Sequence, residues 1–228
     1  YGLGDLEKSE NLGLKALLNR AGISGNKKIT SGTIGFTIAP RINAAGRMGC
    51  AARAVEMFLT HDPKLAFTIA QELCDENQQR QQMENTMMKE ALELLHQRQF
   101  SLEKEKVIVL WKEGWHHGVI GIASSRISEI YHCPVIMISL EGDMGKGSGR
   151  SIQGFNLYQA LAAGLSVGKE NLETLRHEMN QYAKEHLDEE CLVPKLEIDC
   201  RLEEEDLSLD TAKQLHLLEP YGVGNATP

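Results

Sequence analysis

The sequence lacks the long apolar segments of a membrane protein. No apolar run approaches the roughly 20 residues that a helix needs to span a bilayer. The start of the chain, YGLGD, has no basic residues followed by an apolar stretch, so it does not resemble a signal peptide. The absence of an initial Met suggests that the sequence begins inside a longer protein. Its 228 residues, 42% of them hydrophobic, are enough for one or two domains with a real core.

Cysteine is scarce and scattered. The five cysteines are odd in number, and no C-x-x-C pair occurs among them. This pattern argues against a zinc site or a disulfide framework, and a reducing cytoplasm is the simplest setting. The cysteines are Cys50, Cys74, Cys133, Cys191 and Cys200.

Hydrolase signatures are missing as well. The sequence contains no D-x-D, no D-H-H and no H-E-x-x-H. A metal-dependent hydrolytic centre needs clustered carboxylates and histidines to hold ions and activate water. We therefore expect no metal ligands in this chain.

Charge is unevenly distributed along the chain. A net charge of -8 argues against a protein that coats nucleic acid with its whole surface. Residues 35–53 nevertheless contain three arginines and no acid, and residues 144–169 contain Lys146, Arg150 and Lys169 and no acid. Such stretches can bind a phosphate backbone locally, although chance gaps in acid content are an alternative.

A long helix is the clearest predicted element. Asp62 suits the N-cap and Pro63 the first helical position, and no Gly or Pro follows until after Phe100. The middle, Asp75 to Gln82, has no apolar residue, so it must bridge solvent or pack as a charged strut. We expect a rigid connector between two lobes. A coiled-coil dimer is the alternative, but the apolar repeat breaks in the middle.

The residues after this helix predict an α/β unit. A strand at 107–111, a helix at 119–131 and a strand at 134–139 indicate a parallel crossover pair. The other predicted elements are helices at 11–20, 51–60, 157–163, 172–187 and 208–218 and strands at 145–151 and 195–202.

Three motifs contain residues suited to binding phosphate. PRINAAGR (40–47) reads as a loop that enters a helix; its two arginines can each bind phosphate oxygens, and Asn43 can orient a ligand. GWHHG (114–118) lies between a strand and a helix, where ligands often bind in such units. GKGSGRS (145–151) has alternating glycines, two hydroxyls and two bases, as in an anion cradle, but it is not a Walker A loop.

Each motif also has a purely structural reading. The first is then a plain loop with a capping Gly. In the second, a His caps the helix or covers the indole of Trp115. The third is a hairpin with flexible glycines.

Taken in this order, the motifs resemble those of the RecJ single-strand-specific exonucleases of the DHH phosphoesterase superfamily. The resemblance covers nearly the whole chain and includes the long helix, which is similar to the one joining the family's DHH lobe to its DHH-associated lobe. The matching segments are PRINAAGRMG (40–49), GWHHGVIGI (114–122), GKGSGRSIQGF (145–155) and EPYGVGN (219–225), the last resembling the opening of an OB-fold domain.

This resemblance implies a 5′ to 3′ exonuclease that hydrolyses single-stranded DNA in repair and recombination. Two divalent ions, Mn²⁺ or Mg²⁺, would be held by DHH-lobe motifs absent from this chain. The implied partners are single-stranded DNA, single-strand-binding protein and a RecQ-type helicase, and the implied state is a cytoplasmic monomer.

Site residues follow from the matching motifs. The resemblance implies supporting catalytic roles for Asn43, Arg47 and His116. The implied substrate-binding residues are Arg41, Arg47, Lys146, Gly147, Ser148, Gly149, Arg150, Ser151 and Gly164.

Two departures from the family pattern stand out. The first-lobe aspartates and D-H-H are absent, because the sequence begins just after their expected position. The family's GGHxxAAG motif is represented only by AAGL (162–165), its tail. We favour a loop missing from the printed sequence near 161–162 over a deletion.

The predicted fold class is α/β. Residues 1–61 would end the DHH lobe, 62–100 form the connecting helix, 101–190 form the DHH-associated domain with a mixed, partly parallel sheet, and 191–228 begin an OB-like β domain. Two other functions stay open: a compact DHH phosphodiesterase of short oligonucleotides or cyclic dinucleotides, and a non-catalytic DNA-binding or scaffold relative. Intact metal motifs upstream would favour a nuclease, and their loss a scaffold.

Overall fold

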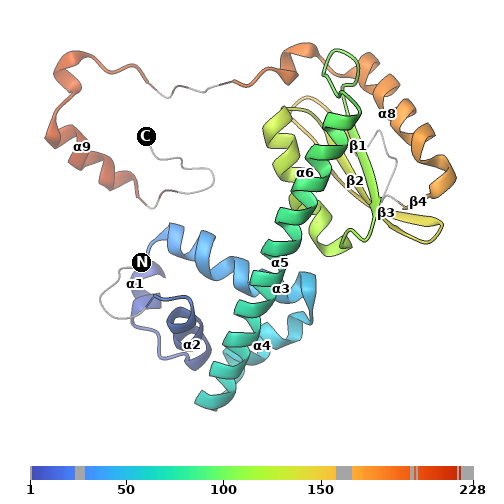
Figure 1. Cartoon of the computed structure of the whole chain (residues 1–228). Helices are drawn as coiled ribbons and strands as arrows, with labels where there is room; N and C mark the ends of the chain where they lie inside the picture. The colour runs from blue at the N-terminus through green and yellow to red at the C-terminus, as the bar shows by residue number, and fades with distance from the viewer. Residues whose placement is uncertain are drawn as a thin grey trace. The chain divides into compact units, whose positions relative to one another are not determined.

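The structure is a computed structural model that describes residues 2–23, 29–157, 166–195, 198, 200–219 and 221. The chain divides into two compact units (Figure 1). One comprises residues 1–79 and 196–228, and the other comprises residues 80–195. The division falls inside a long helix, so this helix contributes to both units.

The first unit is helical. Its core is formed by buried side chains that include Leu17, Ile38, Met57, Ile69 and Leu73. The predicted helices near 11–20 and 51–60 are confirmed. The elements are α1 (Gly2–Glu7), α2 (Leu12–Arg20), the π-helix η1 (Thr33–Ile38), α3 (Ala39–Met48), α4 (Ala51–Leu59) and the start of α5 (Pro63–Gln97).

The prediction of a loop at 40–47 was wrong, because this segment lies within α3. Pro40 lies in the first turn of α3, directly after the π-helix η1, so it does not end the helical segment. Ala44 and Ala45 are fully buried, so the small residues serve helix packing. The signature that suggested an open backbone is therefore a packed helix.

Helix α5 confirms the predicted long helix. Asp62 Oδ1 accepts a hydrogen bond from Lys64 N at 2.8 Å, which stabilises the first turn. The polar middle is not solvated on every side, since Asn77 is 4% exposed, and Glu84, two residues beyond the end of this middle at Gln82, is 6% exposed. Of the two predicted possibilities, packing as a charged strut fits this burial.

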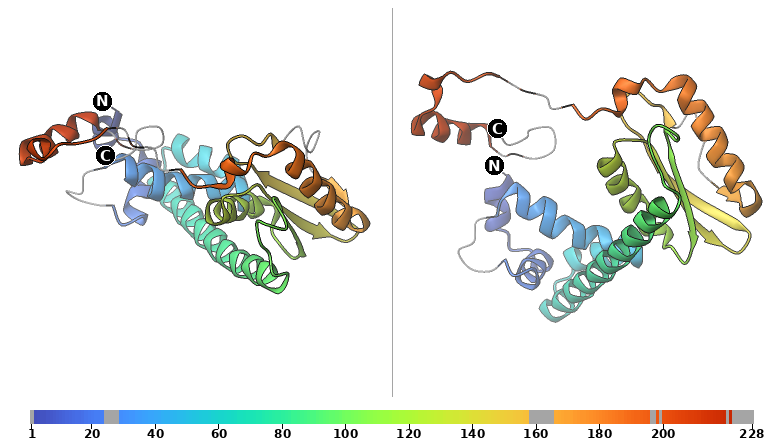
Figure 2. Two further views of the ribbon diagram at one scale, coloured as in Figure 1. Left: turned by 90° about the horizontal axis from the view of Figure 1, so that it is seen from above. Right: turned by 45° about the horizontal axis from the view of Figure 1, so that its top comes forward.

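The second unit is built on a four-stranded mixed sheet in the order β1-β2-β3-β4. Strands β1 and β2 pair in parallel, as predicted, and the other pairs are antiparallel. Figures 1 and 2 show α6 and α8 on opposite faces of the sheet. The predicted α/β class, mixed sheet and preceding helix are confirmed. The elements are β1 (Ile108–Glu113), α6 (His117–Tyr131), β2 (Val135–Glu141), β3 (Met144–Arg150), β4 (Ser166–Gly168) and α8 (Leu172–His186).

The glycines of β3 make room for the core on the α8 side of the sheet. Leu140, Ile138 and Ile136 of β2 lie opposite Gly145, Gly147 and Gly149, so each bulky side chain faces a glycine. A Cβ atom on Gly145 would lie 2.5 Å from Ile138 Cγ2. The sequence suggested that these glycines open the β3 backbone to an anion. On the α8 face of the sheet, the groups that approach the β3 backbone are side chains of β2.

The remaining elements are short helices, one before α8 and the others after it. The predicted helix at 208–218 is confirmed, whereas no described residue of 195–202 belongs to a strand. The OB-like domain stays a prediction. The predicted helix at 157–163 lies outside the described residues after Leu157. The elements are η2 (Lys169–Asn171), η3 (Glu189–Leu192), η4 (Glu204–Asp206), α9 (Leu209–Leu215) and η5 (His216–Leu218).

None of the described helices combines the length and the apolar character of a membrane span.

Candidate nucleic-acid interface

A short row of polar side chains lies on the α6 side of β3. Side chains alternate between the two faces of a strand, so Lys146, Ser148 and Arg150 lie on the face away from the glycines. Contact with α6 confirms this for two of them: a Cβ on Gly121 would lie 3.0 Å from Ser148 Oγ and 3.2 Å from Arg150 Nη2. Lys146 and Arg150 are exposed, so the row faces solvent beside α6.

Arg150 is held in one orientation by its neighbours. Its Nε donates to Ser125 Oγ at 2.8 Å, and its Nη1 donates to Gly149 O at 2.8 Å. Ser125 in turn donates to Gly121 O at 3.0 Å, which fixes the hydroxyl on α6. In the part of the chain that the structure describes, no carboxylate pairs with Arg150. The guanidinium is thus oriented beside α6, and because the residue is exposed its N–H groups can still donate to an anion.

Ser151 is committed to a structural role. Its hydroxyl donates to Phe155 O, which closes the turn after β3. Gly147 and Gly149 are two of the β3 glycines that face the core. Any contact that they make with a ligand would therefore use their backbone N–H or C=O groups. Gly164 lies outside the described residues.

His116 caps α6. Its Nδ1 accepts from Gly118 N at 3.2 Å, and its ring stacks on that of His117 at 5.0 Å. For Nδ1 of His116, the structure therefore shows the helix cap that the sequence offered as an alternative to ligand binding. Ser125 follows eight residues after His117, which is about 12 Å along the helix. His116 therefore lies at the start of α6, whereas Arg150 of β3 contacts α6 further along, at Gly121 and Ser125.

The other predicted site residues lie in the first unit, on α3. Asn43 and Arg47 are four residues apart and both exposed, so they share one helix face. Arg41 is half-buried and donates from Nη1 to Thr37 O at 2.5 Å, one turn back. Its Nε is buried and has no hydrogen-bond partner among the described residues. The structure does not bring Arg41 onto the face of the other two.

Sequence reasoning missed Gly121 and Ser125. Both lie on the α6 face that meets β3, four residues apart; Gly121 falls within GWHHGVIGI (114–122) but was given no role, and Ser125 follows that segment. The available signal was weak: two small residues at i and i+4 mark the side of a helix that allows a close neighbour. The partner that they serve, Arg150, can be identified only once the strand is placed.

No metal centre is formed within the described residues. They contain no group of three or more His, Cys, Asp or Glu side chains arranged to hold an ion. The residues present therefore do not fit the two-ion site that the family resemblance implies.

The chain is similar to a known domain family and to known exonucleases. The model of the DHHA1 domain matches residues 104–185. The single-stranded-DNA-specific exonuclease RecJ of Bacillus subtilis is 33% identical over 244 residues, covering 100% of this chain and 30% of the relative. RecJ of Haemophilus influenzae is 34% identical, covering 89% of this chain and 39% of the relative.

Solved structures agree with the sequence comparison. The crystal structure of RecJ from Thermus thermophilus in complex with Mg²⁺ matches with a TM-score of 0.81 and 29% identity, covering 100% of this chain and 36% of that one. The chain thus spans less than half of the length of each of these relatives.

Proposed function

The chain belongs to the RecJ family and contains a DHHA1 domain, and on this premise we propose that it grips the phosphate backbone of single-stranded DNA for a nuclease. The finer assignment is a 5′ to 3′ exonuclease of DNA repair and recombination. The observation that carries the proposal is Arg150, exposed, oriented by Ser125 and paired with no described carboxylate.

The chemistry of this row suits a phosphate. Arg150 offers a planar guanidinium, Lys146 a flexible ammonium and Ser148 a hydroxyl, all on one face of β3. Guanidinium groups bind phosphate oxygens through paired, charge-assisted hydrogen bonds. Phosphate contacts position a strand but carry no base information, so this row would bind any sequence.

Other residues of the proposed interface lie on α3. Asn43 and Arg47 are exposed there and suit a supporting role near the reacting phosphate, with Arg41 beside them in sequence. In the second unit, His116 would support the backbone contact from the start of α6. These roles rest on the family's motifs together with the exposure of the side chains.

The divalent ions of the proposed nuclease would be supplied elsewhere. Mn²⁺ or Mg²⁺, two per site, would be held by DHH-lobe motifs that this sequence does not contain. When bound, such ions activate water and stabilise the charge of the phosphate under attack. The contribution of this chain would be to hold and orient the DNA. Single-strand-binding protein and a RecQ-type helicase are the proposed protein partners of the monomeric, cytoplasmic enzyme.

Binding of a labelled single strand tests the proposal. We expect Arg150→Ala to weaken binding and Arg150→Lys to weaken it less, because Lys keeps the charge but loses the hydrogen bond to Ser125 and the planar fork. Fluorescence anisotropy at fixed salt gives the affinities.

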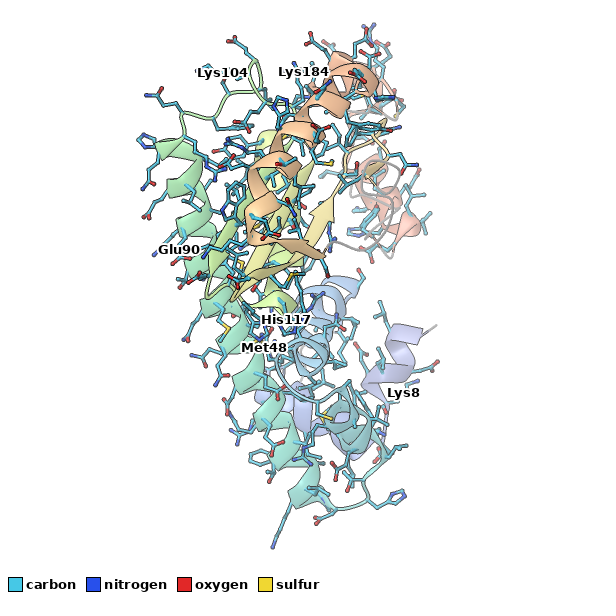
Figure 3. All side chains as sticks on the ribbon, turned by 90° about the vertical axis from the view of Figure 1, so that its right-hand side faces the viewer. Lys8, Met48, Glu90, Lys104, His117 and Lys184 are labelled. Atoms are coloured by element: carbon cyan, nitrogen blue, oxygen red, sulfur yellow. The ribbon has the colours of Figure 1, made fainter. Side chains whose placement is uncertain are left out.

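A matched control is Lys184→Ala, which removes one exposed positive charge from α8 on the opposite face of the sheet (Figure 3). Equal losses for Arg150→Ala and Lys184→Ala would indicate a general charge effect and contradict a specific grip.

A further inference from the structure

A second concave site lies in the same unit, at the carboxyl ends of the parallel strands. The cavity has a volume of about 710 Å³ and is walled by α5, by the loop between β1 and α6, and by the end of β2. Parallel strands in α/β folds commonly bind ligands at this edge, and cavities of this size hold small molecules. The phosphate-gripping row does not line it.

Part of the cavity lining is apolar. It is formed by Met87, Trp115 and Leu140, which are 3%, 5% and 6% exposed. Met83, 40% exposed, adds a thioether to the α5 wall. Thioethers make favourable contacts with aromatic rings, and the exposed ring of His117 is available for stacking at the opposite wall.

The rim of the cavity is rich in hydrogen-bond acceptors. Glu141 is exposed at the end of β2 and has no ion pair within the described residues. Glu113 pairs with Lys169 at 2.9 Å. Glu90 is held by Lys112 at 2.7 Å and by the indole N–H of Trp115 at 2.8 Å, and these two donors lower the pKa of its carboxyl.

This charge pattern selects the ligand. Glu113 and Glu90 are each paired with a lysine, which leaves Glu141 as the rim carboxylate without an ion pair among the described residues, and no group of the described side chains is arranged to hold a metal ion. An apolar lining with acceptors at the rim fits a neutral, flat group that carries N–H donors. Nucleobases with an exocyclic amino group have this chemistry, and carboxylates accept hydrogen bonds from the amino group of cytosine.

We infer that this cavity binds an unstacked nucleobase of the strand whose backbone Arg150 grips. The inference rests on the proposed function. Because His117 and Ser125 are about 12 Å apart along α6, the base would belong to a nucleotide a few positions from the gripped phosphate. The cavity would favour cytosine over thymine, which has no exocyclic amino group, whereas the Arg150 row has no base preference.

The test compares oligo-dC and oligo-dT of equal length at neutral pH, using the 228-residue chain. We expect dC to bind roughly fivefold more tightly, the effect of one net hydrogen bond.

Thr86→Trp, which fills the cavity from α5, should abolish the preference, and Glu141→Gln should reduce it. Asn85→Trp is the matched control, because Asn85 is exposed on α5 and does not line the cavity. Arg150→Ala should weaken both oligonucleotides and keep their ratio.

The outcomes separate the two proposals. Equal binding of dC and dT by the wild type overturns the base site and leaves the backbone grip intact. Binding of neither oligonucleotide overturns the grip and the base site together. Thr86→Trp could also destabilise the protein, which a melting temperature below that of Asn85→Trp would reveal. In that case Glu141→Gln, at an exposed residue, is the deciding variant, and an unchanged preference for dC over dT in it overturns the inference.

Discussion

Single glycines in β3 decide how closely the core packs. A methyl group on Gly145 would press on Ile138 Cγ2 at 2.5 Å, on Leu140 Cδ2 at 3.1 Å and on Val167 Cγ1 at 3.4 Å. Ile and Val are branched at Cβ, so their side chains have few other rotamers to adopt. The site has no room for one more carbon.

We predict that Gly145→Ala lowers the free energy of unfolding by about 1–3 kcal/mol, the usual cost of overpacking. Gly35→Ala is the control, because a methyl group there meets no atom within 4 Å. Urea unfolding measures both. Equal stability of Gly145→Ala and wild type would show that the strand can move and that the glycine is not required for packing.

Asn180 is a buried side chain whose hydrogen bonds replace missing backbone partners. Its Oδ1 accepts from Lys106 N at 2.6 Å and from Val107 N at 2.9 Å, and its Nδ2 donates to Val107 O at 3.0 Å. The side chain is 7% exposed. It thereby anchors α8 to the start of β1.

We predict that Asn180→Ala costs about 1–3 kcal/mol for each buried group left without a partner. Asn171→Ala should change stability little, since Asn171 is exposed and makes only a 3.4 Å contact with Glu170. Thermal unfolding of the two variants checks this. A loss for Asn180→Ala no larger than that for Asn171→Ala would contradict the anchoring role.

Residue identities predicted only part of the interface. Arg150 was identified because an arginine among glycines and hydroxyls suggests an anion site, and the structure orients it as an available donor. Ser125 was missed because its function depends on a contact between residues 25 positions apart. The packing of the β3 glycines against β2 was not predicted, because the local sequence does not reveal it, and their role in binding substrate stays a prediction.

At the scale of elements, α5 is joined to α6 by a charged cluster. Glu84 is 7% exposed and accepts from Arg80 and Arg126, each at 2.8 Å. The side chain of Arg80 is 12% exposed and that of Arg126 is 52% exposed. Glu84 is thus a buried carboxylate, close to the polar middle of α5, that pairs with two arginines.

We predict that Glu84→Ala destabilises the second unit by roughly 3 kcal/mol, because it removes the buried carboxylate that Arg80 and Arg126 share. Glu93→Ala, which removes an exposed carboxylate from the same helix, is the control. Hydrogen exchange of the α5 amides together with urea unfolding measures the effect. A Glu84→Ala protein as stable as Glu93→Ala would mean that the cluster contributes nothing.

Element boundaries show what sequence patterns can and cannot predict. The start of α5 and the parallel pair β1 and β2 were predicted because caps and apolar runs are local signals. The helix α3 was mistaken for a loop because glycine and proline usually interrupt helices, while burial of Ala44 and Ala45 in the tertiary core outweighs that tendency here.

At the scale of the whole molecule, the chain contains the proposed DNA grip and no recognised metal motif. We predict that the 228-residue chain alone does not hydrolyse single-stranded DNA in the presence of Mn²⁺. Release of mononucleotides from a 5′-labelled strand measures this. Metal-dependent, chelator-sensitive release at an ordinary enzymatic rate would show that this chain holds a catalytic centre of its own.

The central claim is that Arg150 grips a phosphate of single-stranded DNA, and the salt dependence of binding tests it most directly. Each phosphate contact to a single strand contributes about 0.7 to the slope of log affinity against log salt concentration. The measurement is this slope for the wild-type chain and for Arg150→Ala. We predict a slope smaller in magnitude by about 0.7 in the variant, for all sequences alike. Identical slopes and affinities would remove Arg150 from the interface and leave Arg41 and Arg47 as the remaining candidates.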